Sequence, residues 1–231
     1  FVAPHGPMEA KEEDKAKYTS RLDTPRHPAK TYAAMVDSLD QAIGSILSSL
    51  DSEGIADNTI VLFFSDNGGY YNFGGINKPL RGGKLESYEG GVRVNAVMRW
   101  PDVLPPNTIN ENVVSVMDVY PSLMAATGIS PSYTKKIDGI DRWSAIIGKG
   151  DKERGEPLIF TSNIPIYNQF KYGVLDEQWK LIQHVNHKRR TSEVDTELYN
   201  VWSDPNETTD LSLERPDIVE RLTRVLDKRL A

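Results

Sequence analysis

Apolar residues recur at helical spacing in one long segment near the start of the chain. Over residues 30–52 they follow one another at steps of three and four, which is typical of an amphipathic helix, and Gly54 is placed to end it. Residues 1–30 hold several prolines and many charges without a clear period, so we expect mostly loop there. The apolar positions of the predicted helix are Met35, Leu39, Ile43, Ile46 and Leu50.

Shorter apolar runs follow this helix. Residues 59–65 predict a buried strand, which with the helix would form an αβ unit of a doubly wound sheet. Residues 92–100 predict a second strand and residues 112–116 a third. Residues 121–127 predict a helix with Pro121 near its first turn and Gly128 just beyond its end.

The pattern changes at about residue 148. Residues 148–157 read as a charged linker, so we predict a boundary that divides the chain into 1–147 and 148–231. Four short strand-like runs then follow without helices between them, and an amphipathic helix covers residues 216–230. This order predicts a small antiparallel sheet with a C-terminal helix. The predicted strands are residues 158–161, 172–175, 179–183 and 197–200.

Composition excludes several classes of function. The 231 residues carry a net charge of −6, which does not favour nucleic acid or an anionic membrane surface as a partner. No apolar run approaches the roughly 20 residues of a membrane span. Cysteine is absent, which excludes disulfides, thiolate metal sites and a cysteine nucleophile within these residues. The first residue is Phe1 rather than methionine, and we expect the sequence to be a fragment.

The candidate chemistry follows the first predicted strand. Ser65, Asp66 and Asn67 end that strand and precede two glycines, at the position where α/β folds bind ligands. A carboxylate beside an amide carbonyl offers hard oxygen ligands suited to calcium or magnesium, although Asp-Asn-Gly is also a common turn. Lys84 lies in a later glycine-flanked turn, where it could bind an anion or be a solvated surface lysine. Together the two features suggest an anionic ester as substrate.

Several longer stretches resemble the sulfatase family, and the arylsulfatase B type most of all. The resemblance rests on FFSDNGG, on PLRGGKLESYEGGVR, and on VSVMDVYPSLMAATGI followed by DGIDRW. It extends from FVAPHGPMEA at the start to QWKLI and ELYNVWSDPNETTDL near the end. The fold it implies is part of an alkaline-phosphatase-like mixed α/β sheet flanked by helices, followed by the small antiparallel sheet.

The resemblance also implies roles for individual residues. Asp66 and Asn67 would bind one calcium ion, Lys84 would contact a sulfate oxygen, and His5 would protonate the departing alcohol. The family's nucleophile is a formylglycine made from the first residue of a Cys- or Ser-x-Pro-x-Arg segment, which this sequence lacks. We therefore expect a missing N-terminal half to complete the site, and we expect the chain alone to be inactive and to bind calcium weakly.

Other polar and aromatic residues are assigned structural roles. We expect Glu89 to anchor its loop through backbone hydrogen bonds, and Asp118 to cap or pin the start of the helix that follows it. Tyr70, Tyr71 and Phe73 could line the mouth of a pocket or pack their own loop. We expect ion pairs with carboxylates at Arg81 and Arg93, core positions in the small sheet at Trp179 and Tyr199, and no role for His27, His184 and His187.

Two alternatives and several further expectations stay open. A phosphodiesterase or phosphatase of the same superfamily would need histidine after Asp66 and two zinc ions, so Asn67 counts against it. A catalytically inert sulfatase-like chain is the other alternative. Resemblance favours sulfated sugars of the glycosaminoglycan type as substrate. Asn206 begins an N-glycosylation sequon, usable only in a secretory setting, and the expected location is lysosomal or secreted, or periplasmic in a bacterium.

Overall fold

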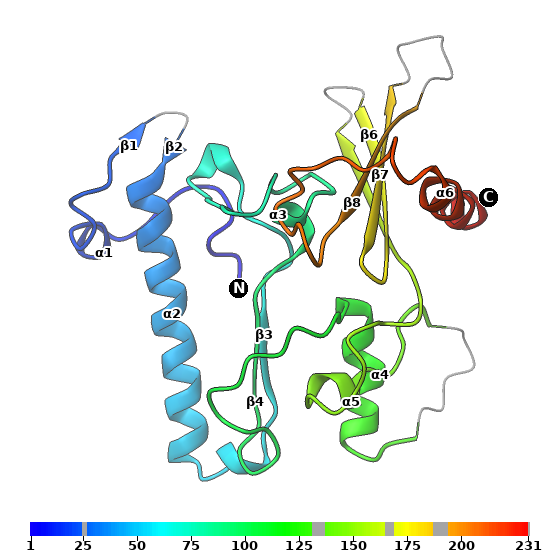
Figure 1. Ribbon diagram of the computed structural model, residues 1–231. Coiled ribbons are helices and arrows are strands. Elements are labelled where there is room, and N and C mark those ends of the chain that lie inside the picture. The colour runs from blue at the N-terminus through cyan, green and yellow to red at the C-terminus, as the bar shows by residue number, and fades with distance from the viewer. Residues whose placement is uncertain (25–26, 131–136, 165–168, 187–193, 231) are drawn as a thin grey trace.

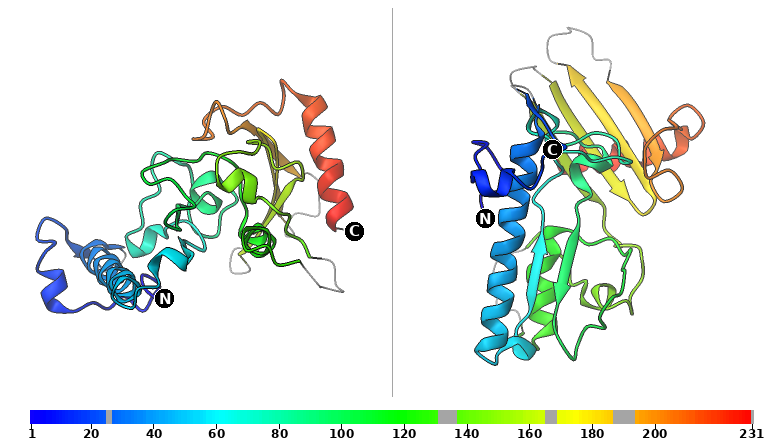
Figure 2. Two further views of the ribbon diagram at one scale, coloured as in Figure 1. Left: turned by 90° about the horizontal axis from the view of Figure 1, so that it is seen from below. Right: turned by 90° about the vertical axis from the view of Figure 1, so that its left-hand side faces the viewer.

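The computed structural model describes residues 1–24, 27–130, 137–164, 169–186 and 194–230. The first part of the chain holds a long helix beside a two-stranded ribbon, and the last part holds a four-stranded sheet with a helix on one face (Figure 1). Two further views show the four-stranded sheet to the side of the long helix, near the N-terminal end of that helix (Figure 2). The structure is therefore a mixed α/β region joined to a small antiparallel sheet, as the sequence predicts.

The long helix confirms the first predicted element. Helix α2 (Ala29–Ser52) matches the predicted residues 30–52 to within one residue, and Gly54 follows it with a φ of +66°. The Asp23 carboxylate accepts hydrogen bonds from the backbone N–H groups of Lys30 and Thr31, which have no partner within the helix. The preceding residues are mostly loop, interrupted by α1 (Glu12–Lys15) and by the short strands β1 (Asp23–Thr24) and β2 (His27–Pro28).

The next two strands form an antiparallel pair. Strand β3 (Val61–Phe64) pairs with β4 (Ala96–Arg99), so both predicted strands exist but are shorter than residues 59–65 and 92–100. The prediction that residues 59–65 are buried is wrong for the described structure, because Phe63 is 39% exposed and Val97 on β4 is 63% exposed. Neither strand has a second partner among the described residues, and no described element covers this ribbon closely. Two short 3₁₀ helices, Ala56–Asn58 and Tyr71–Phe73, flank β3.

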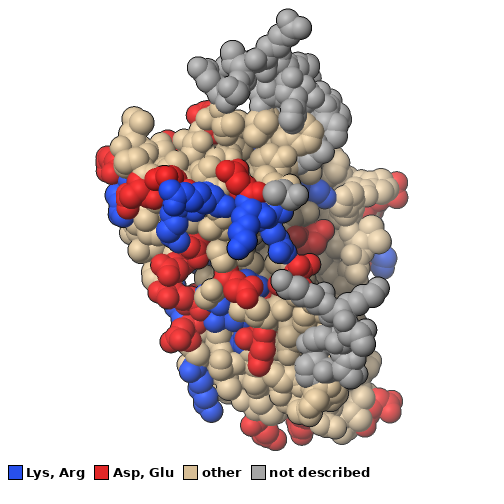
Figure 3. Space-filling view, turned by 90° about the vertical axis from the view of Figure 1, so that its right-hand side faces the viewer, with Lys and Arg blue, Asp and Glu red and all other residues tan. Residues whose placement is uncertain are grey.

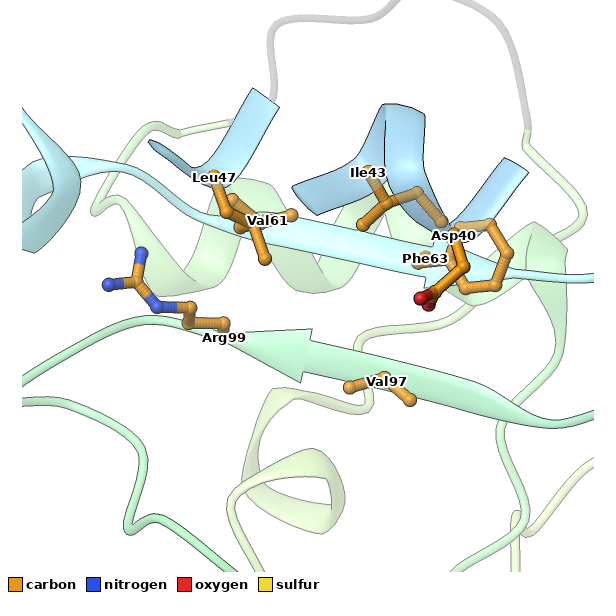
Figure 4. Close-up of a pocket in the computed structure, with 7 residues that line it drawn as sticks. All are labelled: Asp40, Ile43, Leu47, Val61, Phe63, Val97 and Arg99. Atoms are coloured by element: carbon orange, nitrogen blue, oxygen red, sulfur yellow. The ribbon is translucent and has the colours of Figure 1, made fainter. Parts of the chain in front are cut away.

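An apolar groove of about 370 Å³ separates α2 from this ribbon. Ile43 and Leu47 of α2 point toward Val61 and Phe63 of β3 across it (Figure 4). The groove contains none of the residues predicted for the active site. Its full lining is Asp40, Ile43, Leu47, Val61, Phe63, Val97 and Arg99.

The predicted third strand at residues 112–116 is wrong. Residues 112–115 form no strand, and the helix predicted at residues 121–127 begins earlier, as α4 (Val116–Ala126). A capping box explains the early start, because Ser115 accepts from the Met117 N–H while Asp118 accepts from the Ser115 N–H at 2.9 Å. Pro121 consequently lies inside the helix rather than in its first turn.

The C-terminal sheet confirms the last predicted elements. It contains β5 (Leu158–Ile164), β6 (Gln169–Asp176), β7 (Trp179–Asn186) and β8 (Asp195–Asn200), each antiparallel to the next. Helix α6 (Pro216–Leu230) packs on one face and closes a core that excludes water completely. Burial of each leucine or valine there contributes about 2 kcal/mol. The fully buried residues of this core are Val174, Leu181, Leu198, Leu222 and Leu226.

The predicted linker at residues 148–157 is tied to the preceding helices. Arg154 is buried and donates two hydrogen bonds to the Asp118 carboxylate, at 2.9 and 2.7 Å. Arg142, which precedes α5 (Trp143–Ile146), donates to the carbonyls of Asp151 and Glu153. The prediction that Asp118 pins the start of α4 is confirmed, while the boundary between residues 147 and 148 stays a prediction.

The surface around α6 mixes charges of both signs. Figure 3 shows basic and acidic side chains next to one another on this face. Arg215 pairs with Asp217 and Arg229 pairs with Asp138, so neither cation is left without a counter-charge. In the described parts of the chain, moreover, no helix has the length and apolar character needed to cross a bilayer.

Candidate active site

The Asp66–Asn67 pair lies in the loop that follows β3. Ser65 donates its hydroxyl to the Asn67 carbonyl at 2.7 Å, which closes a tight turn at the end of the strand. The Asn67 amide nitrogen donates to the Gly68 carbonyl, leaving its side-chain oxygen directed elsewhere. Asp66 is exposed. The turn that the sequence offered as an alternative is therefore present, and it presents two oxygen-bearing side chains.

Lys84 is joined to this loop through the backbone. Its N–H donates to the Gly69 carbonyl at 3.2 Å. Asn77 reinforces the junction, because its side chain accepts from the Gly69 N–H at 2.7 Å and donates to the carbonyls of Gly69 and Gly82. The Asn77 side-chain amide therefore pairs with both the N–H and the carbonyl of Gly69, as the backbone of a neighbouring β-strand would. The sequence analysis missed Asn77, although an asparagine between two glycine-rich loops is a signal for such bridging.

Glycines allow the two loops to touch. A Cβ on Gly68 would lie 1.7 Å from the Gly90 carbonyl oxygen, and a Cβ on Gly90 would lie 2.4 Å from the Arg81 carbonyl oxygen. The Gly68 N–H also donates to the Gly91 carbonyl at 2.9 Å. The glycines of SDNGG and YEGG thus permit backbone-to-backbone packing of two loops. From the sequence, the glycines after Asn67 were expected to let the backbone approach a bound metal ion, and that expectation stays a prediction.

The Lys84 ammonium group is available to a ligand. Its side chain is half-buried, and no hydrogen bond or ion pair with a described residue engages it. Nearby carboxylates have other partners, since Glu86 accepts from the Gly83 N–H and lies 3.4 Å from the Lys171 ammonium. An unpaired cation at a glycine-rich loop can hold an anionic group without first breaking an internal ion pair.

His5 is exposed at the start of the chain, and its loop packs against the same region. Its Nδ1 lies 2.9 Å from the Gly6 carbonyl oxygen. Gly6 faces the Phe73 ring, since a Cβ there would lie 3.1 Å from it, and Phe73 stacks edge-on against Tyr70 at 5.2 Å. The Tyr71 hydroxyl donates to the Gly82 carbonyl. These aromatic residues therefore pack the loops that carry His5, Asp66 and Lys84.

A polar cluster that the sequence did not reveal lies next to the Lys84 turn. We define the Glu197 cluster as Arg81, Tyr88, His184, Glu197 and Tyr199. Arg81 donates to the Tyr199 hydroxyl at 2.7 Å and to the Tyr88 hydroxyl at 3.0 Å, and its guanidinium lies 3.5 Å from Glu197. Both phenol hydroxyls donate to the Glu197 carboxylate. The prediction that Arg81 pairs with a carboxylate is confirmed.

The Glu197 cluster shifts the pKa of its carboxylate. Burial alone would raise the pKa of Glu197, but the His184 ring, the two phenol hydroxyls and the guanidinium outweigh burial and lower this pKa to about 2. Burial and the neighbouring carboxylate raise the pKa of Tyr88 and Tyr199. The Glu197 carboxylate therefore stays ionised at neutral pH, and both phenols stay protonated and act as donors.

The remaining histidines and arginine have identifiable surroundings. His184 lies 3.3 Å from Glu197, although it was assigned no role, and His27 Nδ1 lies 2.8 Å from the Tyr71 carbonyl oxygen. His187 lies outside the described residues. Arg93 pairs with Glu89 at 3.8 Å, as expected. The predicted core positions are also confirmed, because Tyr199 is buried and Trp179 packs against the α6 core.

A buried ion triad anchors the residue that follows Tyr88. Lys180 on β7 is fully buried, and its ammonium lies 2.9 Å from Glu89 and 3.0 Å from Glu207. The Glu207 carboxylate also accepts from the Glu89 N–H at 2.7 Å. Burial raises the pKa of Glu207. Glu89 therefore anchors its loop as expected, but its carboxylate does so through ion pairs rather than through the backbone hydrogen bonds that the sequence suggested, and the sequence did not reveal Lys180 and Glu207 as partners.

Only part of a metal site is found among the described residues, which contain no cluster of three or more histidine or acidic side chains suited to a metal ion. Asp66 and Asn67 are hard oxygen donors of the kind that calcium prefers. Two donors fall short of the six to eight oxygens of a calcium shell. These residues fit an edge of a calcium site that other groups would have to complete.

Comparison with known proteins agrees with this arrangement. A mixed α/β region followed by an antiparallel sheet and a helix is the alkaline-phosphatase-like fold of sulfatases. The crystal structure of the putative sulfatase yidJ from Bacteroides fragilis superposes on this chain with a TM-score of 0.74 at 21% identity. The match covers 99% of this chain and 52% of that one. The sulfatase family model matches residues 1–129, and the C-terminal model of N-sulphoglucosamine sulphohydrolase matches residues 84–231. The chain belongs to the sulfatase family.

Individual relatives cover nearly the whole chain. A sulfatase of Formosa agariphila is 34% identical over 94% of this chain and 41% of its own length. Arylsulfatase J of Mus musculus is 28% identical over 99% of this chain and 44% of its own. The crystal structure of Ps i-CgsB in complex with k-i-k-neocarrahexaose has a TM-score of 0.85 at 30% identity, over 98% of this chain and 48% of that one. The chain thus spans slightly less than half the length of these relatives.

Proposed function

We propose that this chain contributes part of the active site of an enzyme that hydrolyses sulfate esters. The chain belongs to the sulfatase family, and one structural observation supports the proposal. The Lys84 N–H is bonded to the Gly69 carbonyl at 3.2 Å, which holds an unpaired cation beside the loop of Asp66 and Asn67. A fixed positive charge next to hard oxygen donors suits an anionic sulfate group.

Lys84 would hold a sulfate oxygen. The sulfate ester is anionic before and during cleavage, so a point cation can offset its charge without changing its own protonation state. Removing one such electrostatic contact in other enzymes lowers turnover by about 10²- to 10³-fold. The Lys84 ammonium makes no hydrogen bond or ion pair with a described residue, which supports this role.

His5 would supply the proton that the departing alcohol needs. Cleavage of the sulfur–oxygen bond leaves negative charge on the ester oxygen, and an imidazolium within hydrogen-bond reach can neutralise that charge. General acid catalysis of this kind contributes about 10²- to 10⁴-fold. The contact between Gly6 and Phe73 keeps the His5 loop against the loop that follows Asp66 and Asn67, which supports the assignment.

Asp66 and Asn67 would hold a calcium ion together with ligands from outside the described residues. When bound, calcium would offset charge on the sulfate group, and a formylglycine would supply the nucleophile. The Cys- or Ser-x-Pro-x-Arg segment that is the source of formylglycine is absent from this sequence. The chain would therefore act together with a part of the protein that carries the nucleophile.

The apolar groove between α2 and the β3–β4 ribbon supports the proposal that another part of the protein covers this surface. Phe63 and Val97 are 39% and 63% exposed although they lie on strands. We infer that the N-terminal half of a longer sulfatase covers this groove and brings the nucleophile to the strand-end loops. Relatives that are more than twice as long as the matched segment are consistent with such a part.

The proposed substrate class is a sulfated sugar of the glycosaminoglycan type. The solved relative at 30% identity was crystallised with k-i-k-neocarrahexaose, and a relative at 36% identity over 57% of this chain is N-acetylgalactosamine-6-sulfatase of Canis lupus familiaris. The proposed location is lysosomal or secreted, or periplasmic in a bacterium. Asn206 of the sequon is half-buried with its Oδ1 enclosed, and its glycosylation stays a prediction.

The decisive experiment is an assay of the full-length protein that contains this chain. We expect it to hydrolyse 4-nitrophenyl sulfate and not 4-nitrophenyl phosphate, and we expect Lys84→Ala to lower kcat/KM by at least about 10²-fold. Lys78→Ala, at an exposed lysine six residues earlier, is the matched control and should leave kcat/KM unchanged. Preference for the phosphate ester would favour the phosphatase alternative, and activity that survives Lys84→Ala would overturn the assigned role.

The isolated 231-residue chain provides a second test. It should show no turnover of an aryl sulfate, because the nucleophile is absent from it. Calorimetric titration should show only weak calcium binding, since two of the required oxygen donors are present. Measurable hydrolysis, or tight stoichiometric binding of calcium, would contradict the proposal that the site is completed elsewhere.

A further inference from the structure

The C-terminal sheet presents its second face to the turn that carries Lys84. We define the Lys84 loop as residues 81–89. Side chains alternate along β7, so Leu181 packs under α6 while Lys180 and Ile182 point to the opposite side. Ile182 packs there with Tyr88 of the Lys84 loop. One sheet therefore joins the α6 core to the loop of the candidate active site.

The Lys180 triad fixes the end of this loop. The Lys180 ammonium lies 2.9 Å from Glu89 and 3.0 Å from Glu207, and both Lys180 and Glu207 have side chains with 0% exposure. Glu207 reaches Glu89 twice, through the shared ammonium and through the Glu89 N–H at 2.7 Å. Buried ions are costly to desolvate, and apolar residues of similar volume could fill the same space. Unlike apolar packing, the hydrogen bonds and ion pairs of the triad are directional, and they therefore fix one position for the Glu89 backbone.

Backbone hydrogen bonds connect the Glu89 backbone to Lys84, so that the position of one constrains the position of the other. Gly90, which follows Glu89, donates to the Arg81 carbonyl at 2.7 Å and so closes the Lys84 loop at its base. Gly91 accepts from the Gly68 N–H at 2.9 Å, and Lys84 donates to Gly69 at 3.2 Å. The loop of Asp66 and Asn67 is therefore bonded to the Lys84 loop at Lys84, and to the segment directly after that loop at Gly91.

Three additional hydrogen bonds hold the same loop. Arg81 donates to the Glu207 carbonyl at 3.2 Å and to Tyr199 on β8 at 2.7 Å. Ser162 on β5 donates to the Leu85 carbonyl. Contacts thus flank Lys84 on both sides in sequence, and they come from three strands and from the segment that contains Glu207.

We propose that Glu89, Lys180 and Glu207 are positioning residues that place Lys84 for sulfate through the C-terminal sheet. The inference rests on the proposed function, because it takes Lys84 as the group that holds the sulfate. None of the three touches substrate in this scheme. Their effect reaches the reaction only through the geometry of the Lys84 loop.

Kinetics of the full-length protein test this inference. Lys180→Met keeps the length of the side chain and removes its charge, which leaves two buried carboxylates facing each other. We expect kcat/KM for 4-nitrophenyl sulfate to fall at least tenfold and the inhibition constant of inorganic sulfate to rise. Lys180→Arg, which keeps the charge, should recover part of the loss.

Leu222→Ala is the matched control for a loss of stability alone. Leu222 is equally buried, but it lies on α6 at the opposite face of the sheet. Below the unfolding temperature this variant should keep the wild-type kcat/KM and inhibition constant. An equal loss of activity in Lys180→Met and Leu222→Ala, or wild-type kinetics in Lys180→Met, would overturn the inference.

A second variant and a second measurement cover a failure of Lys180→Met to fold. Glu207→Gln keeps an acceptor for the Glu89 N–H and removes one charge, so it should fold and show a smaller loss in the same direction. Hydrogen exchange of the 231-residue chain should show faster amide exchange over residues 81–91 in Glu207→Gln and wild-type exchange there in Leu222→Ala. Unchanged exchange in Glu207→Gln would exclude the positioning role.

The two proposals can fail separately. If the wild-type protein does not hydrolyse aryl sulfates, the proposed function fails and the inference about Lys84 fails with it. If the wild type is active and Lys84→Ala is not, but the Lys180 and Glu207 variants keep wild-type kinetics, only the positioning inference is overturned.

Discussion

Arg154 donates two hydrogen bonds to Asp118, from Nε at 2.9 Å and from a terminal nitrogen at 2.7 Å, and both side chains are buried. Asp118 also accepts from the backbone N–H groups of Ser115 and Ile140. One carboxylate therefore caps α4, fixes the segment at Ile140 and holds the chain that leads into β5. Burial alone would raise the pKa of Asp118, but the contacts with Arg154 and the two N–H groups lower it.

We predict that Asp118→Asn lowers the free energy of unfolding by about 3–5 kcal/mol, because it leaves the buried Arg154 cation without a counter-charge. Urea denaturation at neutral pH measures the change. Asp138→Asn is the control, since Asp138 also pairs with an arginine but its side chain is 64% exposed, and it should change stability by less than about 1 kcal/mol. Similar losses in the two variants would show that burial of the Asp118 pair has no special effect.

Gly90→Ala should be destabilising by about 1–3 kcal/mol. A methyl group there would lie 2.4 Å from the carbonyl oxygens of Arg81 and Gly82, so the two loops would have to move apart. Gly44→Ala is the control, because Gly44 lies inside α2 with nothing within 4 Å of the added Cβ. That variant should be stabilised by about 0.5–1 kcal/mol. Thermal unfolding of the two variants would contradict the reasoning if their shifts had the same sign.

Glu197 should make the stability of the chain depend on pH in the acidic range. Its folded-state pKa of about 2 lies below the ordinary value, so the ionised form favours the folded state. The stabilisation is present above about pH 5 and is lost as the pH falls toward 2, because the unfolded chain takes up its proton first. Glu197→Gln should therefore be less stable than wild type at pH 6, with a difference that shrinks at pH 3.

Denaturation at both pH values measures this difference. Glu207, whose pKa burial raises, is present in both proteins, so its opposite pH dependence cancels in the comparison. Glu214→Gln, at an exposed glutamate, should show no such trend. A difference between Glu197→Gln and wild type that is constant from pH 6 to pH 3 would refute the prediction.

Truncation of the α6 core should have a large effect. Leu222→Ala removes a side chain with 0% exposure and should lower the free energy of unfolding by about 2–5 kcal/mol. Leu213→Ala, at a leucine that is 95% exposed, removes the same atoms from water-exposed surface and should be close to neutral. Chemical denaturation that gave equal costs would mean that α6 does not close the core as described.

The sequence predicted elements whose pattern is local. Helix α2 and the strands of the C-terminal sheet follow from the period of their apolar residues, because each buries one face against a single neighbour. The failures at residues 112–116 have a different cause. Their apolar run resembles a strand, but Ser115 and Asp118 form a capping box whose geometry starts the helix there. The strand predicted as buried at residues 59–65 is only partly buried, because Phe63 and Phe64 remain exposed beside an open groove.

The sequence singles out site candidates only where they stand in a short motif, as His5, Asp66, Asn67 and Lys84 do. Asp66, Asn67 and Lys84 stand out because they interrupt apolar or glycine-rich stretches. Lys180 and Glu207 do not, since a lysine on an amphipathic strand and a glutamate in a polar turn both look solvated. The ion pair between Glu89 and Lys180 joins residues that are 91 positions apart, so only the folded chain shows it.

The uncovered β3–β4 ribbon has a consequence for the behaviour of this chain in solution. Strands with free edges and exposed apolar side chains can pair with strands of another molecule. Val97 and Phe63 lie on such strands, next to a groove wide enough to admit further side chains. Self-association of the isolated chain should therefore rise with its concentration, and a charged residue at position 97 should keep it monomeric.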